Sequence, residues 1–275
     1  MKKFLTLATI ICCASVFTFA NGVAEESNSF APSTESPMYK IACDSAFSPF
    51  DIQVEEGEVV DATVVSSANN MGDYYGIDVE IIDAIAKDQG FDYALMPMDF
   101  SAVIPGLVSG LIDGAIAGMF ATDERRETVD FSDGYYGAVL SLVVDVNDDS
   151  IASFDDLKGK IAACKEGTTN MIWCQNHADM YGFTVKVYPD TASMMLAVGN
   201  GQADFLLQSY PEISYQMSIG AHTNLKIAME AVSEPRQLAF SVVKGKNQEL
   251  LAMFNAGLAH IRANGIYDKI ISNYE

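Results

Sequence analysis

The chain has 275 residues, 49% of them hydrophobic, and its formal net charge is −21. This length is enough for one large domain or two of ordinary size. The strong negative charge makes nucleic acid and anionic membranes poor partners. It also repels acidic ligands at long range, so any site for an anion must be a local positive pocket.

The first residues have the features of a secretory signal peptide. Lys2 and Lys3 precede an uncharged apolar run and a set of small residues. We therefore expect residues 1–24 to be removed and the polar residues 25–37 to form a disordered leader. No later apolar run approaches the ~18 residues that span a bilayer. The protein is expected to be exported, to the periplasm or, if Cys12 or Cys13 of the apolar run carries a lipid, to the cell surface.

Three cysteines follow the predicted signal peptide, and an odd number cannot be fully paired. They are Cys43, Cys164 and Cys174. Cys164 and Cys174 could bridge a strand to the following helix in an oxidising compartment, or both could remain free.

The first half of the chain alternates between patterns typical of strands and of helices. Apolar residues at helical spacing end at Gly90, which provides a helix stop, and the valine-rich residues 52–75 fit a β-hairpin. The other expected elements are a strand at 39–43, a helix at 78–89, a strand at 91–95, a short helix capped by Ser101 and a strand at 112–118.

The stretch from Leu111 to Asp133 combines this last strand with a helix start and a basic residue. Residues 112–118 form a small apolar run without alternation, which is typical of a strand buried on both faces. Thr122 and the two acids after it are typical of a helix N-terminus. Arg125 follows in the first turn, where a cation faces the positive end of the helix dipole. It needs a compensating anion, either a bound ligand or a neighbouring acid.

The second half repeats the alternation of the first. Phe100, Gly110 and Asp113 are matched, 91 positions later, by Thr191, Gly201 and Asp204. The expected elements are strands at 139–144, 161–164, 183–187, 203–207 and 238–243, and helices at 169–178, 193–198, after Asn247 and at 267–273. Such alternation builds mostly parallel sheets covered by helices, so two similar α/β lobes are predicted.

Two loops have a composition that suits a binding site. The loop after the first strand carries Phe47 and Phe50, which either line a site or fill the core. In the loop 165–170, Gly167 lets the backbone turn while the N–H groups of Thr168, Thr169 and Asn170 point outward from a helix N-terminus. A carboxylate would fit there, although many such loops use Gly and Thr only for turning and capping.

Several short motifs occur in a fixed order between Tyr39 and Tyr274. They are Asp44…Phe47-Ser48-Pro49-Phe50, Gly76-Ile77-Asp78-Val79, Phe100…Ile104-Pro105, Ile116-Ala117-Gly118-Met119…Thr122-Asp123-Glu124-Arg125, Asp130-Phe131-Ser132-Asp133, Leu157-Lys158-Gly159-Lys160, Gly167-Thr168-Thr169 and Gly265-Ile266-Tyr267-Asp268-Lys269. In this order they resemble the periplasmic solute-binding proteins of polar amino-acid ABC importers, family 3.

The resemblance implies an α/β, two-lobed periplasmic-binding-protein fold, each lobe a mostly parallel sheet flanked by helices. It implies lobe 1 at 38–134 and 241–275, lobe 2 at 141–231, and hinge crossings at 135–140 and 232–240. The ligand, an amino acid or related small carboxylate, would bind in the cleft between the lobes and close it. The implied partner of the monomeric protein is an ABC transporter permease, and no cofactor is implied.

Carried over to matching positions, the resemblance also implies roles for single residues. Arg125 would fork onto the ligand carboxylate, for which its planar donor geometry is suited, and the N–H of Thr169 would reach the same group. The carbonyl of Gly118 would accept from an α-ammonium, and Phe47 and Phe100 would sandwich the ligand side chain.

Two further residues complete the implied site. Asp44 would hold the first loop or contact the ligand, and Lys165 stands where the family often has an apolar pocket residue. The expected ligand-binding residues are Asp44, Phe47, Phe100, Gly118, Phe120, Arg125, Lys165, Thr168, Thr169 and Ser209.

Two positions depart from the family pattern. Ser209 stands where an aspartate normally pairs with the ligand ammonium, and Phe120 stands where a Thr or Ser normally contacts the ligand. An ammonium that is desolvated without a carboxylate partner is costly. Either another acid such as Glu212 substitutes, or the ligand is not an ordinary α-amino acid.

The residues favour binding over catalysis. No Ser or Cys nucleophile is placed beside a histidine, and Cys174 and His177 lack the second pair of ligands that a metal site needs. We therefore expect no catalytic residue, metal or cofactor. The enzymatic alternative resembles cyclohexadienyl dehydratases, which eliminate water and carbon dioxide from prephenate on this fold. Their acid matches Glu212, and Arg125 with Lys165 could hold two carboxylates.

Overall fold

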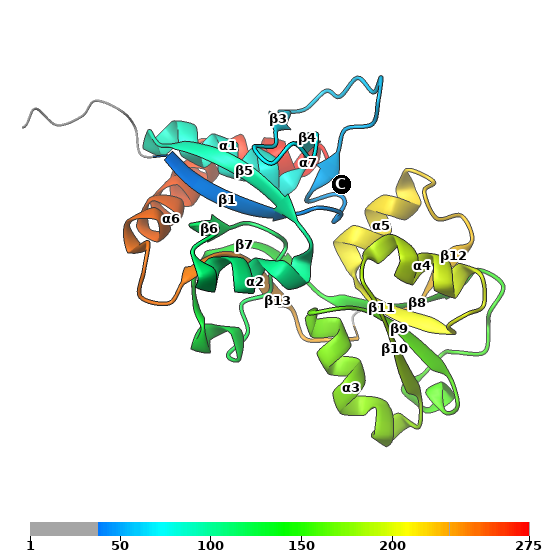
Figure 1. Ribbon diagram of the computed structural model, residues 1–275. Coiled ribbons are helices and arrows are strands. Elements are labelled where there is room, and N and C mark those ends of the chain that lie inside the picture. Colours follow the sequence, from blue (N-terminus) through cyan, green and yellow to red (C-terminus); the bar gives the residue numbers. More distant parts are fainter. Residues whose placement is uncertain (1–37, 231, 275) are drawn as a thin grey trace, which may run out of the picture. The chain divides into compact units, whose positions relative to one another are not determined.

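The structure is a computed structural model that describes residues 38–230 and 232–274. The expected signal peptide and leader lie outside the described residues. The described chain forms two five-stranded sheets and one three-stranded sheet (Figure 1). All of these belong to one compact unit, residues 36–275.

The first five-stranded sheet has the order β5-β1-β6-β13-β7. Its strands are β1 (Met38–Asp44), β5 (Asp92–Met98), β6 (Gly114–Ala115), β7 (Val129–Ala138) and β13 (Arg236–Val243). β1 pairs in parallel with β5 and β6, whereas β13 pairs antiparallel with β6 and β7. A strand from near the end of the chain is thus inserted between two strands of its first half.

Helices cover both faces of this sheet. They are α1 (Ile77–Gln89), α2 (Phe100–Ser109), α6 (Gln248–Ala263) and α7 (Ile266–Ser272). Successive side chains of a strand point to opposite faces. Accordingly, Ile41 packs in a cluster with α1 and α6, and Ala42 packs in a cluster with α2.

The second five-stranded sheet repeats this plan with the order β10-β9-β11-β8-β12. Its strands are β8 (Leu140–Asp145), β9 (Ile161–Lys165), β10 (Thr184–Tyr188), β11 (Phe205–Ser209) and β12 (Leu225–Met229). Its helices are α3 (Thr169–Tyr181), α4 (Thr191–Gly199) and α5 (Tyr210–Ser218), and a short 3₁₀ turn, η2, spans Phe154–Leu157. Cys164 packs in the cluster that contains α3 residues, and Ala163 in the one that contains α4 residues.

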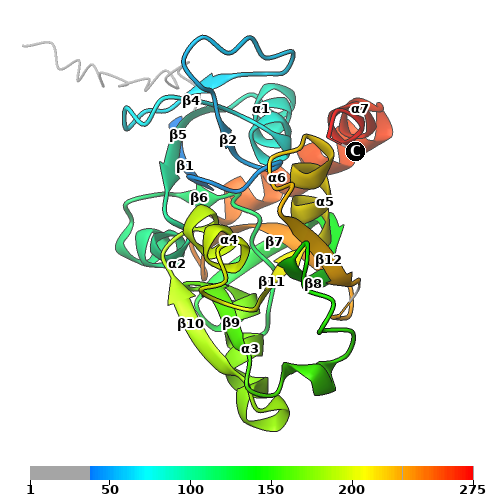
Figure 2. The same ribbon diagram turned by 90° about the vertical axis from the view of Figure 1, so that its right-hand side faces the viewer.

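The chain crosses between the two five-stranded sheets twice (Figures 1 and 2). The first crossing is at Val139, between β7 and β8, and the second joins β12 to β13. Within residues 38–230 and 232–274, no helix is both long and apolar enough to cross a membrane.

Three local predictions were wrong. The strand expected at 112–118 is only Gly114–Ala115, because the chain turns at Gly118 with a φ of 56°. Instead of an α-helix after Thr122 there is one 3₁₀ turn, η1 (Arg125–Glu127), because β7 begins at Val129 and leaves no room for more. The N-cap residue of helix α2 is Asp99 and not Ser101, and the Asp99 side chain makes no capping hydrogen bond.

The residues 52–75 form the small three-stranded sheet. Its strands are β2 (Ile52–Gln53), β3 (Val65–Ser66) and β4 (Asp73–Tyr75), in the order β2-β4-β3. β3 and β4 are the expected hairpin. The valines at positions 59, 60 and 64 lie outside its strands, and Val59 is 96% exposed.

Candidate functional site

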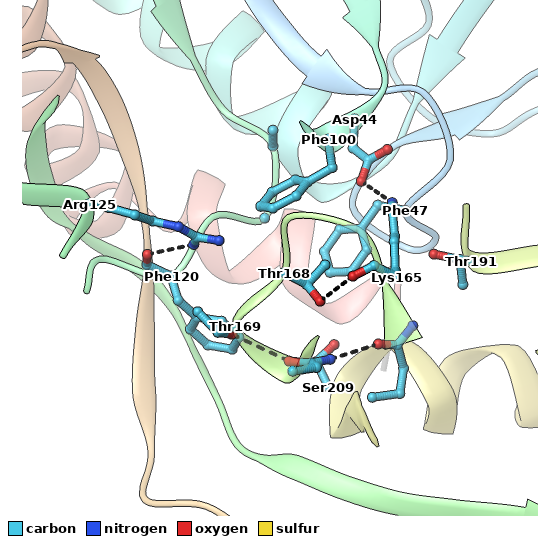
Figure 3. A pocket seen from close by; sticks show the side chains of 14 residues that line it. Asp44, Phe47, Phe100, Phe120, Arg125, Lys165, Thr168, Thr169, Thr191 and Ser209 are labelled. Atoms are coloured by element: carbon cyan, nitrogen blue, oxygen red, sulfur yellow. Dashed lines mark hydrogen bonds and ion pairs between the residues drawn. The ribbon is translucent and has the colours of Figure 1, made fainter. Parts of the chain in front are cut away.

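A cavity lies between residues of the two five-stranded sheets, and we call it the first cavity (Figure 3). All ten residues that the sequence singled out for ligand binding line it, together with four residues outside that set. These four are Ala117, Asn170, Thr191 and Gln208, of which sequence reasoning had indicated only the N–H of Asn170. Thr191 had a signal in the sequence, because it is the internal-repeat counterpart of Phe100 and both residues begin a helix that follows a strand.

The lining residues come from the ends of strands and the starts of helices. Asp44, Lys165 and Ser209 are the last residues of β1, β9 and β11. The carboxyl ends of parallel strands meet at one edge of a sheet, which is where ligands bind in open α/β sheets. Thr169 and Thr191 begin the helices that follow on the second sheet.

Arg125 brings a buried cation to the first cavity. Its side chain donates to the carbonyl oxygens of Phe120 at 2.9 Å and Gly167 at 3.1 Å. Its guanidinium carbon lies 5.2 Å from the centre of the Phe100 ring. Burial lowers the Arg125 pKa to about 10, so the group stays charged at neutral pH. In the described part of the chain no carboxylate lies within 4.0 Å of it, so its charge faces neutral partners.

A second cation, Lys165, is already paired. Its Nζ lies 2.6 Å from Oδ2 of Asp44, and both side chains are more than nine-tenths buried. Asp44 Oδ1 also accepts from the N–H of Ala46 at 3.1 Å, so this carboxylate holds the first loop as well. Because this pair is neutral as a unit, Arg125 supplies the net positive charge of the first cavity.

The N-terminus of α3 faces the same space. Thr168 is its N-cap: the hydroxyl accepts from the N–H of Met171 at 3.2 Å and donates to the carbonyl of Lys165 at 2.8 Å. The N–H groups of a first helical turn have no intrahelical acceptor and suit an anion. The loop before the helix lies close to α2: a Cβ added to Gly167 would be 3.3 Å from Ser101.

Glu212 lies behind Ser209 and does not line the first cavity. The Ser209 hydroxyl donates to Glu212 Oε2 at 3.4 Å, and the Glu212 side chain is fully buried. Burial raises the pKa of Glu212 well above its usual range. It is therefore a buried acid that favours its protonated form, and Ser209 separates it from the first cavity.

Two more buried acids accept hydrogen bonds from the backbone N–H groups of residues that line the first cavity. Asp78 Oδ2 accepts from the N–H of Gly118 at 2.8 Å, and Asp51 Oδ2 accepts from the N–H of Asp44 at 3.1 Å. Burial raises the pKa of Asp78 to about 7 and that of Asp51 well above its usual range. Sequence reasoning placed Asp78 in a motif but assigned neither acid a role.

The sequence also raised the questions of cysteine pairing and metal binding. Cys43, Cys164 and Cys174 are free and buried. Within the described residues, no group of three His, Cys, Asp or Glu side chains could hold a metal ion.

Comparison with known proteins assigns the chain to a family. The model of the bacterial extracellular solute-binding proteins, family 3, matches residues 39–275. The chain belongs to this family. The expected two-lobed α/β fold is confirmed by solved structures of the same type.

Individual relatives bind amino acids according to their names. The chain is 26% identical to a probable histidine-binding protein of Campylobacter jejuni, over 100% of this chain and 99% of the relative. It is 26% identical to an arginine-binding extracellular protein of Bacillus subtilis, over 98% and 96%. A solved structure of an ancestral arginine-binding protein bound to arginine is 31% identical, with a TM-score of 0.75, over 86% of this chain and 97% of that one.

Proposed function

We propose that the protein captures an amino acid or a related small carboxylate in the first cavity and delivers it to an ABC importer. It would act as a monomer outside the cytoplasm, in the periplasm or at the cell surface. One observation carries the proposal: Arg125 is a buried cation that has no carboxylate partner among the described residues, and it lies beside the N-terminus of α3.

Each group would have its own task in binding. A guanidinium has five N–H donors, and two of the Arg125 contacts are to backbone carbonyls, which leaves donors for a carboxylate. The N–H of Thr169 would bind the same carboxylate. Phe47 and Phe100 would flank the rest of the ligand. Histidine and arginine, for which two relatives are named, both carry the carboxylate that Arg125 and Thr169 would bind.

The two sheets would be the cores of two lobes. We place lobe 1 at 38–134 and 241–275 and lobe 2 at 141–231, joined by hinge crossings at 135–140 and 232–240. In support, contacts already connect the two sheets across the first cavity, namely Lys165 with Asp44 and Arg125 with the Gly167 carbonyl. Closure of the lobes would bury the ligand between these groups.

The test is a thermal-shift screen of amino acids, oxo acids and dicarboxylates, followed by calorimetry on variants. A ligand at 100 times its dissociation constant adds about 2.7 kcal/mol of stability. Arg125→Ala should then weaken binding by about 2 to 5 kcal/mol, because a desolvated charge-assisted contact is lost. The matched control is Arg126→Ala, since Arg126 is exposed and lies over Phe131 outside the cavity. Near-wild-type affinity in Arg125→Ala would sink the site assignment.

The dehydratase alternative rests on one observation, the buried acid Glu212 with its raised pKa. A protonated carboxyl can act as a general acid. Glu212, however, lies behind Ser209 and not in the cavity wall. We expect purified protein to form no phenylpyruvate from prephenate, and turnover that Glu212→Gln abolishes would establish the enzyme instead.

A further inference from the structure

The charged side chains that line the first cavity leave one positive charge over. Among the described lining residues they are Asp44, Arg125 and Lys165, two cations and one carboxylate. Lys165 and Asp44 form an ion pair at 2.6 Å, and both side chains are more than nine-tenths buried. Arg125 has no carboxylate within 4.0 Å in the described structure. A ligand of complementary charge therefore carries one net negative charge.

Three buried acids near the first cavity do not change this count. Glu212, Asp51 and Asp78 do not line the cavity. Burial raises the pKa of Glu212 and Asp51 well above the usual range, and that of Asp78 to about 7, which favours the neutral form of each. The described lining therefore offers a ligand no carboxylate except that of Asp44, which Lys165 holds.

An α-ammonium would enter this space without a counter-charge. At neutral pH an α-amino acid carries an ammonium as well as its carboxylate, so its net charge is zero. The carboxylate would pair with Arg125, but the ammonium would lose its water and gain no ionised partner. A desolvated charge that stays unpaired is costly, so the group beside the carboxylate is expected to be neutral.

The hydroxyl groups of the cavity wall favour a hydrogen-bond donor at that place. Thr168, Thr169 and Ser209 each donate their hydroxyl hydrogen to another protein group, at 2.8, 3.3 and 3.4 Å, and the first two bonds are dashed in Figure 3. A hydroxyl has one hydrogen to donate and two lone pairs that accept. The capacity that these side chains have left is therefore to accept. A ligand hydroxyl can donate to such an oxygen, whereas an oxo group cannot.

Ser209 is the acceptor that adjoins the carboxylate end. Asn170, in the first turn of α3, donates to the carbonyl of Leu207 at 2.9 Å, so the start of α3 lies beside the end of β11. Ser209 is the last residue of β11 and lines the first cavity. A ligand whose carboxylate binds at the N-terminus of α3 thus brings its α-carbon near Ser209.

We propose that the ligand is an α-hydroxy carboxylic acid, with its carboxylate at Arg125 and its hydroxyl hydrogen donated to Ser209. The inference rests on the proposed function, because the carboxylate is taken to bind at Arg125. Phe47 and Phe100 line the same cavity and suit an apolar remainder of the ligand.

Four acids with one carbon skeleton test the group beside the carboxylate. Pentanoate and its α-hydroxy, α-amino and α-oxo derivatives differ only at the α-carbon. Calorimetry on the purified mature protein at pH 7 should show α-hydroxypentanoate binding about 2- to 10-fold tighter than pentanoate, the range for one neutral hydrogen bond. It should bind about 10- to 100-fold tighter than α-aminopentanoate, whose ammonium stays unpaired. Equal or tighter binding of the α-amino or the α-oxo acid would overturn the inference.

A single variant tests the acceptor. Ser209→Ala should reduce the affinity for α-hydroxypentanoate about 2- to 10-fold and leave that for pentanoate unchanged. Ser209 is the N-cap residue of α5 but makes no capping hydrogen bond, so we expect the variant to fold. Ser218→Ala, at an exposed position of α5, is the matched control. Unchanged α-hydroxypentanoate affinity in Ser209→Ala, with an intact melting curve, would contradict the assignment of the hydroxyl to Ser209.

Proton release would reveal the arrangement in which an α-amino acid fits instead. Glu212 would then lose its proton and act as the counter-charge behind Ser209. Titrations with α-aminopentanoate in two buffers of different ionisation enthalpy measure any proton released on binding, and we expect none. Tight binding with a released proton, abolished by Glu212→Gln, would overturn the inference in favour of a proton-linked amino-acid site.

The outcomes separate the two proposals. If no carboxylate binds, or if Arg125→Ala binds all of them normally, the proposed function fails. If carboxylates bind through Arg125 without a preference for the α-hydroxyl group, only this inference fails.

Discussion

The charge of the first cavity depends on a few single residues. Arg125 contributes a cation that no carboxylate neutralises in the described structure, whereas Lys165 and Asp44 cancel each other. Ser209 contributes a hydroxyl at the end of β11, and the acid Glu212 behind it is fully buried. Replacing one hydroxyl by a carboxylate should therefore change which ligands are accepted.

Ser209→Asp should create a partner for an α-ammonium. The new carboxylate would line the cavity beside the carboxylate-binding end, and a hydrogen bond to a charged group contributes about 1.5 to 3 kcal/mol. We expect α-aminopentanoate to gain affinity by this amount in calorimetric titrations. Ser218→Asp, at an exposed position of α5, is the control. A Ser209→Asp protein with no gain for α-amino acids would show that the position does not face the ligand nitrogen.

Asp78 should make stability depend on pH. Its folded pKa of about 7 lies above its usual value of 3.8 because the carboxyl is buried, so the folded state holds the proton more tightly. The stabilisation is complete below the unfolded pKa and is lost as the pH rises through the folded pKa. The free energy of unfolding should therefore fall between about pH 4 and pH 7, by about 1.4 kcal/mol for each unit of pKa difference.

Asp78→Asn should reduce this slope, because an amide keeps an acceptor for Gly118 but does not titrate. Urea denaturation over the same pH range measures it. Asp51, whose pKa is raised by burial as well, leaves a residual slope. The control is Asp123→Asn at an exposed position. An identical slope in Asp78→Asn and wild type would contradict the assignment.

At the scale of elements, the turn that leaves β6 shapes the cavity wall. Gly118 has a φ of 56°, and a Cβ there would lie 2.1 Å from the ring of Phe47. The turn directs its N–H to Asp78. Only a glycine allows both the left-handed backbone and the close approach of the ring.

Gly118→Ala should lower stability and ligand affinity together. The left-handed backbone costs an alanine roughly 1 to 2 kcal/mol, and displacing Phe47 adds about 1 to 3 kcal/mol. Gly201→Ala separates these effects, because Gly201 has a φ of 68° and no atom within 4 Å of its would-be Cβ. Thermal melts measure the stability of both variants, and titrations measure their ligand affinity. Equal losses of stability and unchanged binding in both would mean that Phe47 does not shape the site.

At the scale of the whole molecule, the ion pair between Asp44 and Lys165 should couple ligand binding to lobe closure. The two residues end β1 and β9, which belong to different sheets, and both are buried. Removing one partner of a buried pair leaves an uncompensated charge, at a cost of about 3 to 5 kcal/mol. If Lys165 is removed, the closed arrangement of the two lobes should carry this cost, because opening the lobes returns Asp44 to water.

Small-angle scattering measures this coupling. The wild-type radius of gyration should decrease on saturation with ligand, and Lys165→Met should require more ligand for the same decrease. The double variant with Asp44→Asn should recover part of the loss, because no charge is then left buried. A radius of gyration that does not change at saturation would count against closure of two lobes.

The amino-acid sequence by itself determined the class of fold, and its resemblance to a family implied ten of the residues that line the first cavity. Hydrophobic periodicity, helix stops and an internal repeat predicted alternating strands and helices, and the site residues fall at strand ends and helix starts. These are local features, which a sequence encodes within a few neighbouring residues. Local patterning was least reliable where an element is short, as at β6 and η1, because pairing with distant strands limits their length.

Only the tertiary structure decided how the charges are balanced. Lys165 meets Asp44 from 121 positions away, and Asp78 meets Gly118 from 40 positions away. Whether an acid is paired, protonated or free for a ligand depends on burial and on neighbours from other elements. Such neighbours are set by packing between segments far apart in the chain, and spacing along the sequence does not record them.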